Sequence, residues 1–497
     1  MYRCFMWGLV REYVGATAAL ALATAACAPE TSFRVTGEPG DPTVAYSQSE
    51  TAINVSVVTS PGGTTDEVIT ITFNDQNQLV SYPDEFSREV FRGASALGWA
   101  WSEDRGATWM HVPPIDPPPG WAVLWGDPAI AHASLDPSYV FISNVAVPDS
   151  KFPQVGPIDG PLGGYLGGAC IARSTDAGKT FANYGCVSHN EHFYDGGALA
   201  VGNFHVFAAY WDYTDGQTDV WRGSAFGDEP GFQLLPRPFV GLPVSAHPRL
   251  VFDYLNRLWV TTAVGTGPSA ILAVSMWDGV AWTSPKDAAP GATLDPRADV
   301  PMGNGFVLRS SPEFSFDVGQ AVSPDGLLQG EARFVFTRFD PTANHHFLQG
   351  SRCSFFLETC EVVPAWRTSP TFSDQFHPVI SFGGTRIIGT QTEPNWTVSY
   401  YDRLEPDAAT IAVRAGRFAV LPSGAPTFVP RTLIESRPVC QDRRGYWGDY
   451  DDLKPLPRQS LAGPTTYIRA FSDSTPQCNQ QWDYTQDPLH VSALLFE

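Results

Sequence analysis

Two stretches of the sequence, SEDRGATW at residues 102–109 and STDAGKTF at residues 174–181, share the pattern S-x-D-x-G-x-T-aromatic and begin 72 residues apart. Each follows a short alternating run, at 97–101 and at 169–173, and precedes another short strand, so each predicts the turn of a β-hairpin. Asp accepts backbone N–H bonds within such a turn, Gly adopts positive φ, and the aromatic ring packs between neighbouring sheets. A degenerate third copy spans residues 275–282.

The eight-residue motif resembles the Asp box of the BNR repeat proteins, the sialidase-like superfamily of β-propellers. The residues that carry the resemblance are Ser102, Asp104, Gly106, Trp109, Ser174, Asp176, Gly178 and Phe181. The resemblance implies a propeller in which these turns join the third and fourth strands of a blade, on the face opposite the substrate. It implies less about activity, because the Asp box is a structural turn found in enzymes, adhesins and receptors alike.

The rest of the chain divides into units that open on an inner strand followed by a longer second strand. Seven openings occur, 52–77 residues apart, near Glu50, Asp127, Asp195, His247, Pro312, His377 and Asp449. A blade cannot bury both of its faces alone, so this regular series predicts one closed, all-β ring of four-stranded blades over residues 49–497. We expect seven blades, with six as the alternative and the first or last unit as a possible shared blade.

The composition agrees with a β-protein that has many turns. Of 497 residues, 45 are Gly, 43 are Pro and 13% are aromatic, while 17% are charged. The hydrophobic fraction of 43% suffices for a large core and excludes wholesale disorder. The net charge of −21 repels phosphate backbones and anionic membrane surfaces, so we expect no nucleic-acid partner.

The N-terminal segment has the pattern of an export signal. Arg3 and Arg11 precede an apolar stretch that is too short to span a bilayer as a mature helix. Its end, LATAAC at residues 22–27, resembles the lipobox of bacterial lipoproteins, which implies lipidation of Cys27. We therefore expect a signal peptide at 1–26, a lipid-anchor tether at 27–48 and a location in the bacterial cell envelope. Ordinary cleavage near Ala25 or Ala26, and hence secretion, is the alternative.

The remaining six cysteines suit an oxidising compartment. They are Cys170, Cys186, Cys353, Cys360, Cys440 and Cys478. Fifteen connectivities are possible, and the spacing favours three local disulfides, 170–186, 353–360 and 440–478. Zinc binding is the weaker alternative because no C-x-x-C pair occurs.

The starts of inner strands and the ends of second strands share the face opposite the Asp-box turns. The predicted ring comprises Glu50, Asp127, Asp195, His247, Arg249, His377 and Asp449, with Asp75, Trp211, Asp212, Asp340, Tyr401, Asp402 and Asp473. Paired carboxylates beside aromatic rings suit glycoside cleavage. Converging acidic oxygens equally suit Ca²⁺, although no cofactor is required. Any single Asp in this ring can instead be a turn residue, as in Gly126-Asp127-Pro128 or Asp340-Pro341.

Within or beside this ring, the candidate catalytic residues are Asp449, Tyr450, Tyr401, Asp402 and Glu191, and the candidate substrate-binding residues are Arg249, His247, Trp211, Asp212 and Trp447. The segment 443–452 contains a W-G-D-Y element that resembles one recurring in bacterial Asp-box proteins. His189-x-x-His192, near Glu191 and Asp195, has spacing suited to metal binding or proton transfer, or it is a solvated loop. His345-His346 is interpreted as a polar loop.

Sialidases clamp the substrate carboxylate with three arginines, and this triad is not identifiable by position in the sequence. The only segment similar to the one that holds the first arginine is Phe33-Arg34-Val35-Thr36. The acidic face also opposes an anionic sugar. We therefore expect a propeller that hydrolyses or recognises carbohydrate or glycoconjugate, with neutral glycans favoured and contact with a membrane only through the lipid anchor. The alternative is a non-catalytic adhesion module that binds glycan or protein.

Overall fold

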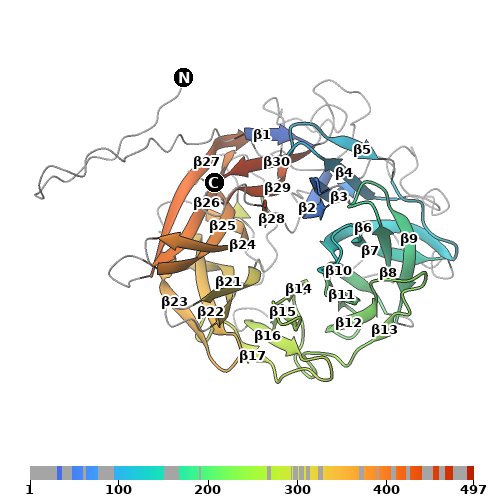
Figure 1. Cartoon of the computed structure of the whole chain (residues 1–497). Coiled ribbons are helices and arrows are strands. Elements are labelled where there is room, and N and C mark those ends of the chain that lie inside the picture. Colours follow the sequence, from blue (N-terminus) through green and yellow to red (C-terminus); the bar gives the residue numbers. More distant parts are fainter. Residues whose placement is uncertain are drawn as a thin grey trace, which may run out of the picture.

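The computed structural model describes the chain over 31–35, 48–59, 63–75, 95–112, 114–149, 167–189, 192–265, 270–292, 294, 300–301, 307–308, 314–322, 328–368, 374–388, 391–403, 410–420, 426–438, 451–457, 465–473 and 490–497. These residues form a ring of seven antiparallel four-stranded sheets around a central axis (Figure 1). The prediction of seven blades is confirmed, and the alternative of six is wrong. Among the described residues, no helix is long and apolar enough to cross a membrane.

Six blades are built from four strands that follow one another in the sequence. Blades 1 to 3 are β2–β5 (Gln48–Thr59, Thr65–Asp75, Leu97–Ser102, Met110–Val112), β6–β9 (Trp121–His132, Val140–Pro148, Gly168–Ser174, Ala182–Val187) and β10–β13 (Tyr194–Val201, His205–Asp212, Gln217–Ser224, Gln233–Leu234). Blades 4 to 6 are β14–β17 (Arg249–Phe252, Leu258–Val264, Ile271–Trp277, Lys286–Asp287), β20–β23 (Phe314–Val322, Leu328–Asp340, His345–Ser354, Cys360–Arg367) and β24–β27 (Asp374–Ile388, Gln391–Arg403, Thr410–Val420, Pro426–Pro438). A two-stranded pair, β18 (Val300–Pro301) and β19 (Val307–Leu308), lies between blades 4 and 5 in the sequence.

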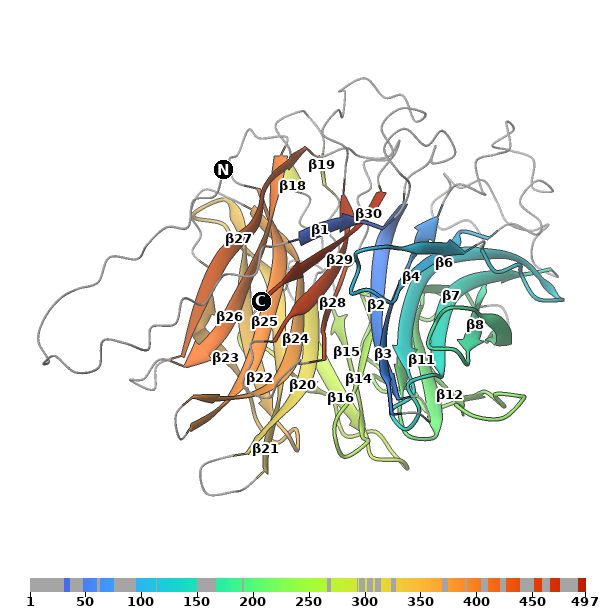
Figure 2. The ribbon, with the colours of Figure 1, turned by 45° about the horizontal axis from the view of Figure 1, so that its top comes forward.

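Blade 7 closes the ring with strands from both ends of the chain. Its sheet order is β1-β30-β29-β28, with β28 (Asp452–Pro455) innermost and β1 (Thr31–Arg34) outermost. β29 (Tyr467–Asp473) and β30 (His490–Phe496) lie between them (Figure 2). Thr31 of β1 pairs with Leu495 of β30. Residues 31–34 were expected in a flexible tether, and the structure corrects this: backbone pairing with β30 makes them the fourth strand of the last blade.

Both S-x-D-x-G-x-T motifs form the turn between the third and fourth strands of a blade, as predicted. In blade 1, the Asp104 carboxylate accepts bonds from the Thr108 backbone N–H at 2.8 Å and the Thr108 hydroxyl at 2.6 Å. Ser102 Oγ accepts the Gly106 N–H at 2.8 Å, and Gly106 has φ 90°. The turn in blade 2 repeats this geometry with Ser174, Asp176, Gly178 and Thr180. The side chains of the motif therefore satisfy the backbone of a tight turn.

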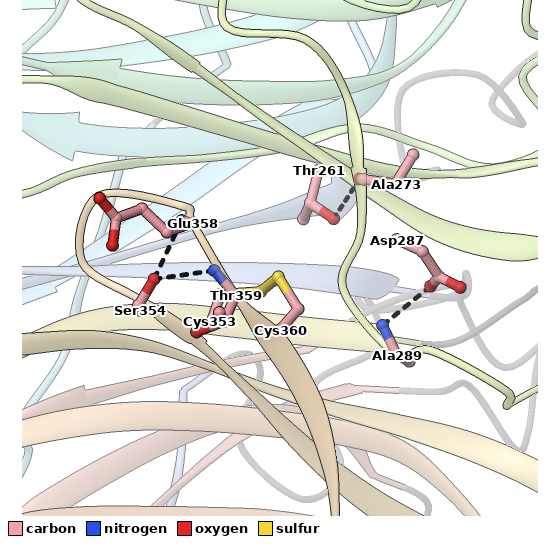
Figure 3. The surroundings of a disulfide bond; sticks show 9 residues. All are labelled: Thr261, Ala273, Asp287, Ala289, Cys353, Ser354, Glu358, Thr359 and Cys360. Carbon is pink, nitrogen blue, oxygen red and sulfur yellow. Dashed lines mark hydrogen bonds between the residues drawn. A yellow bond between two sulfur atoms is a disulfide. The ribbon is translucent and has the colours of Figure 1, made fainter.

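Two disulfides also join the third strand of a blade to its fourth strand. Cys170–Cys186 joins the third and fourth strands of blade 2, and Cys353–Cys360 does so in blade 5. Figure 3 shows Cys353–Cys360 beside Ser354, whose Oγ accepts the backbone N–H groups of Glu358 and Thr359 at 3.0 and 3.1 Å. Two of the three predicted pairs are thus confirmed, while Cys440 and Cys478 lie outside the described residues.

The hydrophobic core lies between blades. One cluster combines Phe141 and Ile171 of blade 2 with Tyr194 and Tyr210 of blade 3, and another combines Trp259 of blade 4 with the phenylalanines of blade 5. The rings of Tyr194 and Tyr210 are stacked with centroids 5.3 Å apart. Flat aromatic faces fill the wedge between two twisted sheets, which accounts for the aromatic-rich composition.

Candidate functional site

A central cavity of about 140 Å³ runs along the axis and is lined by the inner strands of all seven blades. Its walls carry charged groups that include Arg249, Asp317, Asp451 and Lys454. Burial raises the pKa of Asp317 to about 6, although its carboxylate accepts the Phe382 backbone N–H of the next blade at 2.7 Å. The axis therefore contains titratable groups within a narrow polar channel.

Irregularities in the inner strands shape one mouth of this channel. The register of β6 with β7 shifts between Gly126 and Ala129, and that of β10 with β11 shifts between Asp195 and Gly197. Asp127 lies within the first bulge with φ 52°, which is unfavourable for a residue with a side chain. The sequence predicted Asp127 at a strand start; it lies inside β6, which begins at Trp121. Such strain at a channel mouth is typical of functional sites.

The two bulges bring two carboxylates together. The Gly196 backbone N–H points at both of them, 3.2 Å from Asp127 Oδ2 and 3.0 Å from Asp195 Oδ1. The Asp127 and Asp195 side chains are also hydrogen-bonded to each other. A bond between two carboxyl groups requires one proton, so the pair consists of one carboxylic acid and one carboxylate.

His247 identifies the ionised member of this pair. Its Nε2 lies 3.6 Å from Asp195 Oδ2, and its ring packs directly on Gly196. Burial opposes ionisation of Asp195, but hydrogen bonding to His247 and its charge, together with bonds from Asp127 and Tyr213, hold the pKa of Asp195 well below its ordinary value. Asp195 is therefore the member of the pair that favours the ionised form.

An aromatic platform adjoins the carboxyl pair at the end of β11. The rings of Trp211 and Tyr213 are stacked with centroids 3.8 Å apart, and Trp211 lies 6.0 Å from the His247 ring. Phe193 extends the group, 5.6 Å from Tyr213. Flat, partly exposed aromatic rings beside carboxylates are the surface on which sugar rings stack.

Asp212 points away from the platform into a cluster of charged side chains. The Arg237 guanidinium donates bonds of 2.7 Å to each of Asp212, Asp215 and Asp219. His192 Nδ1 lies 2.6 Å from Asp212 Oδ2, and His189 Nδ1 lies 3.2 Å from Asp219 Oδ2. One arginine thus ties the ends of β11 and β12 to the chain that follows β13.

The chain is a seven-bladed β-propeller. It is similar to the GH93 α-L-arabinofuranosidase of Fusarium graminearum (TM-score 0.42, 13% identity, 95% of this chain and 98% of that chain). It is also similar to the leech intramolecular trans-sialidase, with a TM-score of 0.39 and 10% identity over 80% of this chain and 70% of that chain. A third similar structure is the exo-β-1,3-galactanase of Phanerochaete chrysosporium, with a TM-score of 0.31 and 10% identity over 89% of this chain and 99% of that chain. No protein-family model and no curated protein matches the sequence.

The propeller places the predicted site residues in three groups. Arg249 and His247 line the channel and Trp211 lies beside His247, whereas Asp212 is buried against Arg237 and His192. Glu191, Trp447, Asp449 and Tyr450 lie outside the described residues, as do the lipidation residue Cys27 and most of the predicted tether. Tyr401 and Asp402 are described, and their positions differ from the prediction.

Tyr401 and Asp402 have structural contacts in blade 6. Tyr401 is fully buried in a core cluster, and its hydroxyl donates to the Ser472 carbonyl oxygen at 3.1 Å. Asp402 is buried beside Arg414, with an oxygen–nitrogen distance of 2.5 Å. Asp340, also in the predicted ring, caps the Thr342 and Ala343 N–H groups as a turn residue. These contacts do not support catalytic roles for Tyr401 and Asp402.

The central pair Asp127 and Asp195 was present in the predicted ring but was not selected as catalytic. The Gly-Asp-Pro context of Asp127 suggested a turn, whereas its positive φ places it in a bulge at the mouth. Tyr213 and Arg237 were missed completely. No sequence signal marks Arg237, which follows the last strand of blade 3 in an irregular segment.

Proposed function

We propose that this propeller binds and hydrolyses carbohydrate at the channel mouth. The observation that carries the proposal is the juxtaposition of the Asp127–Asp195 pair with His247 and the stacked Trp211–Tyr213 platform. Glycoside cleavage uses one carboxylic acid to protonate the leaving oxygen and one carboxylate as base or nucleophile. Asp127 has the protonated role and Asp195 the ionised role, while the aromatic rings hold the sugar.

A neutral glycan fits this mouth better than an acidic one. The chain has a net charge of −21, and Arg237 is already bound by three aspartates. An arginine in that state does not serve as a clamp for a substrate carboxylate without breaking those ion pairs. Arabinose-, galactose- or glucose-type units, which carry no carboxylate, meet no such opposition.

One observation favours a second function, carbohydrate binding without catalysis. The two carboxyl groups are in hydrogen-bond contact, whereas retaining glycosidases separate theirs by about 5–5.5 Å and inverting ones by about 6.5–9.5 Å. Hydrolysis therefore requires that substrate binding move the Asp127 and Asp195 carboxyl groups apart. A binding module needs only the platform and the polar rim.

Turnover and binding are measured on the same preparation. The purified protein is screened against fluorogenic neutral glycosides, and glycan affinity is measured in parallel by calorimetry. Turnover of a neutral glycoside supports the hydrolase, binding without turnover supports the binding module, and the absence of both contradicts the proposal.

Replacing Trp211 by Ala is expected to weaken glycan affinity about tenfold or more, because half of the stacked platform is lost. The matched control is Trp282→Ala, which removes a partly buried indole from the opposite face of blade 4. Equal affinity of the Trp211 variant and the wild type would place the glycan elsewhere.

We also propose that the protein is exported and held in the bacterial cell envelope by a lipid on Cys27. The support is the lipobox-like segment at 22–27 and the two disulfides, which persist in oxidising compartments. Cys27→Ala is expected to move the protein from the membrane fraction to the soluble fraction of a bacterial host. Cys4→Ala, within the predicted signal peptide, is the control and should leave the fractionation unchanged. Unaltered fractionation of Cys27→Ala would refute the anchor.

A further inference from the structure

Two histidines and a carboxylate converge beside the channel mouth, on the segment that leads into β10 and at the end of β11. One ligand atom from each of His189, His192 and Asp212 lies within 4.8 Å of the other two, and among the described residues no other such His, Cys, Asp or Glu group occurs. We propose that these three residues bind a transition-metal ion of the Zn²⁺ class. This site is separate from the Asp127–Asp195 pair and does not depend on the proposed function.

His189 is already held as metal-binding histidines are. His189 Nδ1 lies 3.2 Å from Asp219, and Asp219 is itself fixed by the Tyr194 hydroxyl at 2.8 Å and by Arg237 at 2.7 Å. A carboxylate on one ring nitrogen sets the tautomer and leaves the other nitrogen as the donor to a metal. The centroids of the two imidazole rings lie 4.1 Å apart, and one nitrogen of each lies within 4.8 Å of the other.

Asp212 supplies the third ligand. Its Oδ2 lies 2.6 Å from His192 Nδ1, so the carboxylate already lies against the imidazole. Binding of the ion involves no oxidation or reduction. The histidine side chains are 30% and 19% exposed, so the site opens to water.

The ligand chemistry selects the ion. Imidazole nitrogens suit Zn²⁺, Ni²⁺ and Cu²⁺, whereas Ca²⁺ and Mg²⁺ prefer cages made of oxygen atoms. This site therefore differs from the Ca²⁺ site that the acidic ring suggested.

Arg237 is the competing cation. Its guanidinium donates to the same Asp212 oxygen at 2.7 Å and also holds Asp215 and Asp219. A positive group at this distance lowers the affinity for a divalent ion. Removal of Arg237 leaves three aspartates without their cation and should therefore strengthen metal binding.

The test is calorimetric titration of the metal-stripped whole protein with ZnCl₂. We expect one ion per chain, at least tenfold weaker binding for His189→Ala and for His192→Ala, and at least tenfold tighter binding for Arg237→Met. His345→Ala, next to Asp374 on the same face, is the matched control and should bind like the wild type. Circular dichroism establishes that each variant is folded.

The absorption spectrum of bound Co²⁺ gives a readout independent of affinity, because nitrogen ligation shifts and intensifies the visible bands. No binding of ZnCl₂ at 1:1 stoichiometry, or binding to folded His189→Ala and His192→Ala equal to that of the wild type, would overturn the proposal. These measurements do not involve glycan turnover, so their outcome tests the metal site independently of the carbohydrate function.

Discussion

Asp195→Asn is expected to lower the turnover of a neutral glycoside about a thousandfold, the central value for loss of a general acid or base. Asp195 is the ionised member of its pair, because His247, Asp127 and Tyr213 hold its pKa below the ordinary value despite burial. An amide of the same shape keeps the fold but cannot accept a proton or attack a sugar carbon. The measurement is kcat and KM for the best substrate of the screen.

The control for this variant is Asp340→Asn, which changes an aspartate that caps a turn at the end of β21. It should leave kcat unchanged. A folded Asp195 variant that retains more than a tenth of wild-type kcat would contradict the assigned role. If the protein only binds glycan, neither variant has turnover to lose, and Asp195→Asn alters affinity alone.

Arg469→Met is expected to lower the free energy of unfolding by about 3–5 kcal/mol, the cost of leaving a buried charge without its partner. Arg469 is fully buried in β29; its guanidinium donates to Asp451 at 2.8 Å and to Ser399 Oγ at 2.7 Å. It also lies 4.5 Å from the centre of the Tyr401 ring. Because Ser399 and Tyr401 belong to blade 6, this one side chain joins the closing blade to its neighbour.

Urea denaturation checks this expectation. The matched control is Arg352→Met, since Arg352 pairs with Glu361 but is 47% exposed, and its loss should change the free energy by no more than about 1 kcal/mol. The double variant Asp451→Asn/Arg469→Met should be more stable than Arg469→Met alone, because no unpaired carboxylate remains buried. A loss below about 1 kcal/mol for Arg469→Met would show that the ion pair does not hold the blades together.

The seven blades were predictable because each opens on an inner strand and a longer second strand, and two of them carry the same turn motif. The turn chemistry of Asp104 and Asp176 acts over a few residues, so the sequence reveals it directly. The role of β1 was not predictable. Four residues at one end of the chain pair with β30 near the other end, and such distant pairing leaves no local pattern.

The site was predictable as a ring but not side chain by side chain. The sequence predicted where the inner strands open but not their bulges, which shift the pairing at Asp195/Gly197 and Phe376/Val379. A shift of one residue turns a side chain to the opposite face of its sheet.

The position of β1 has a consequence for the orientation of the molecule at a surface. Thr31 pairs with Leu495 near the end of β30 that lies toward the turns at 102–109 and 174–181, at the outer edge of blade 7. Cys27 precedes Thr31 by four residues, which span at most about 14 Å. A lipid on Cys27 would therefore hold the ring close to the bilayer by its outer edge, on the side of those turns. The carboxyl pair and its aromatic platform would then face the medium, where long polymeric glycans can reach them without first crossing the space between protein and membrane.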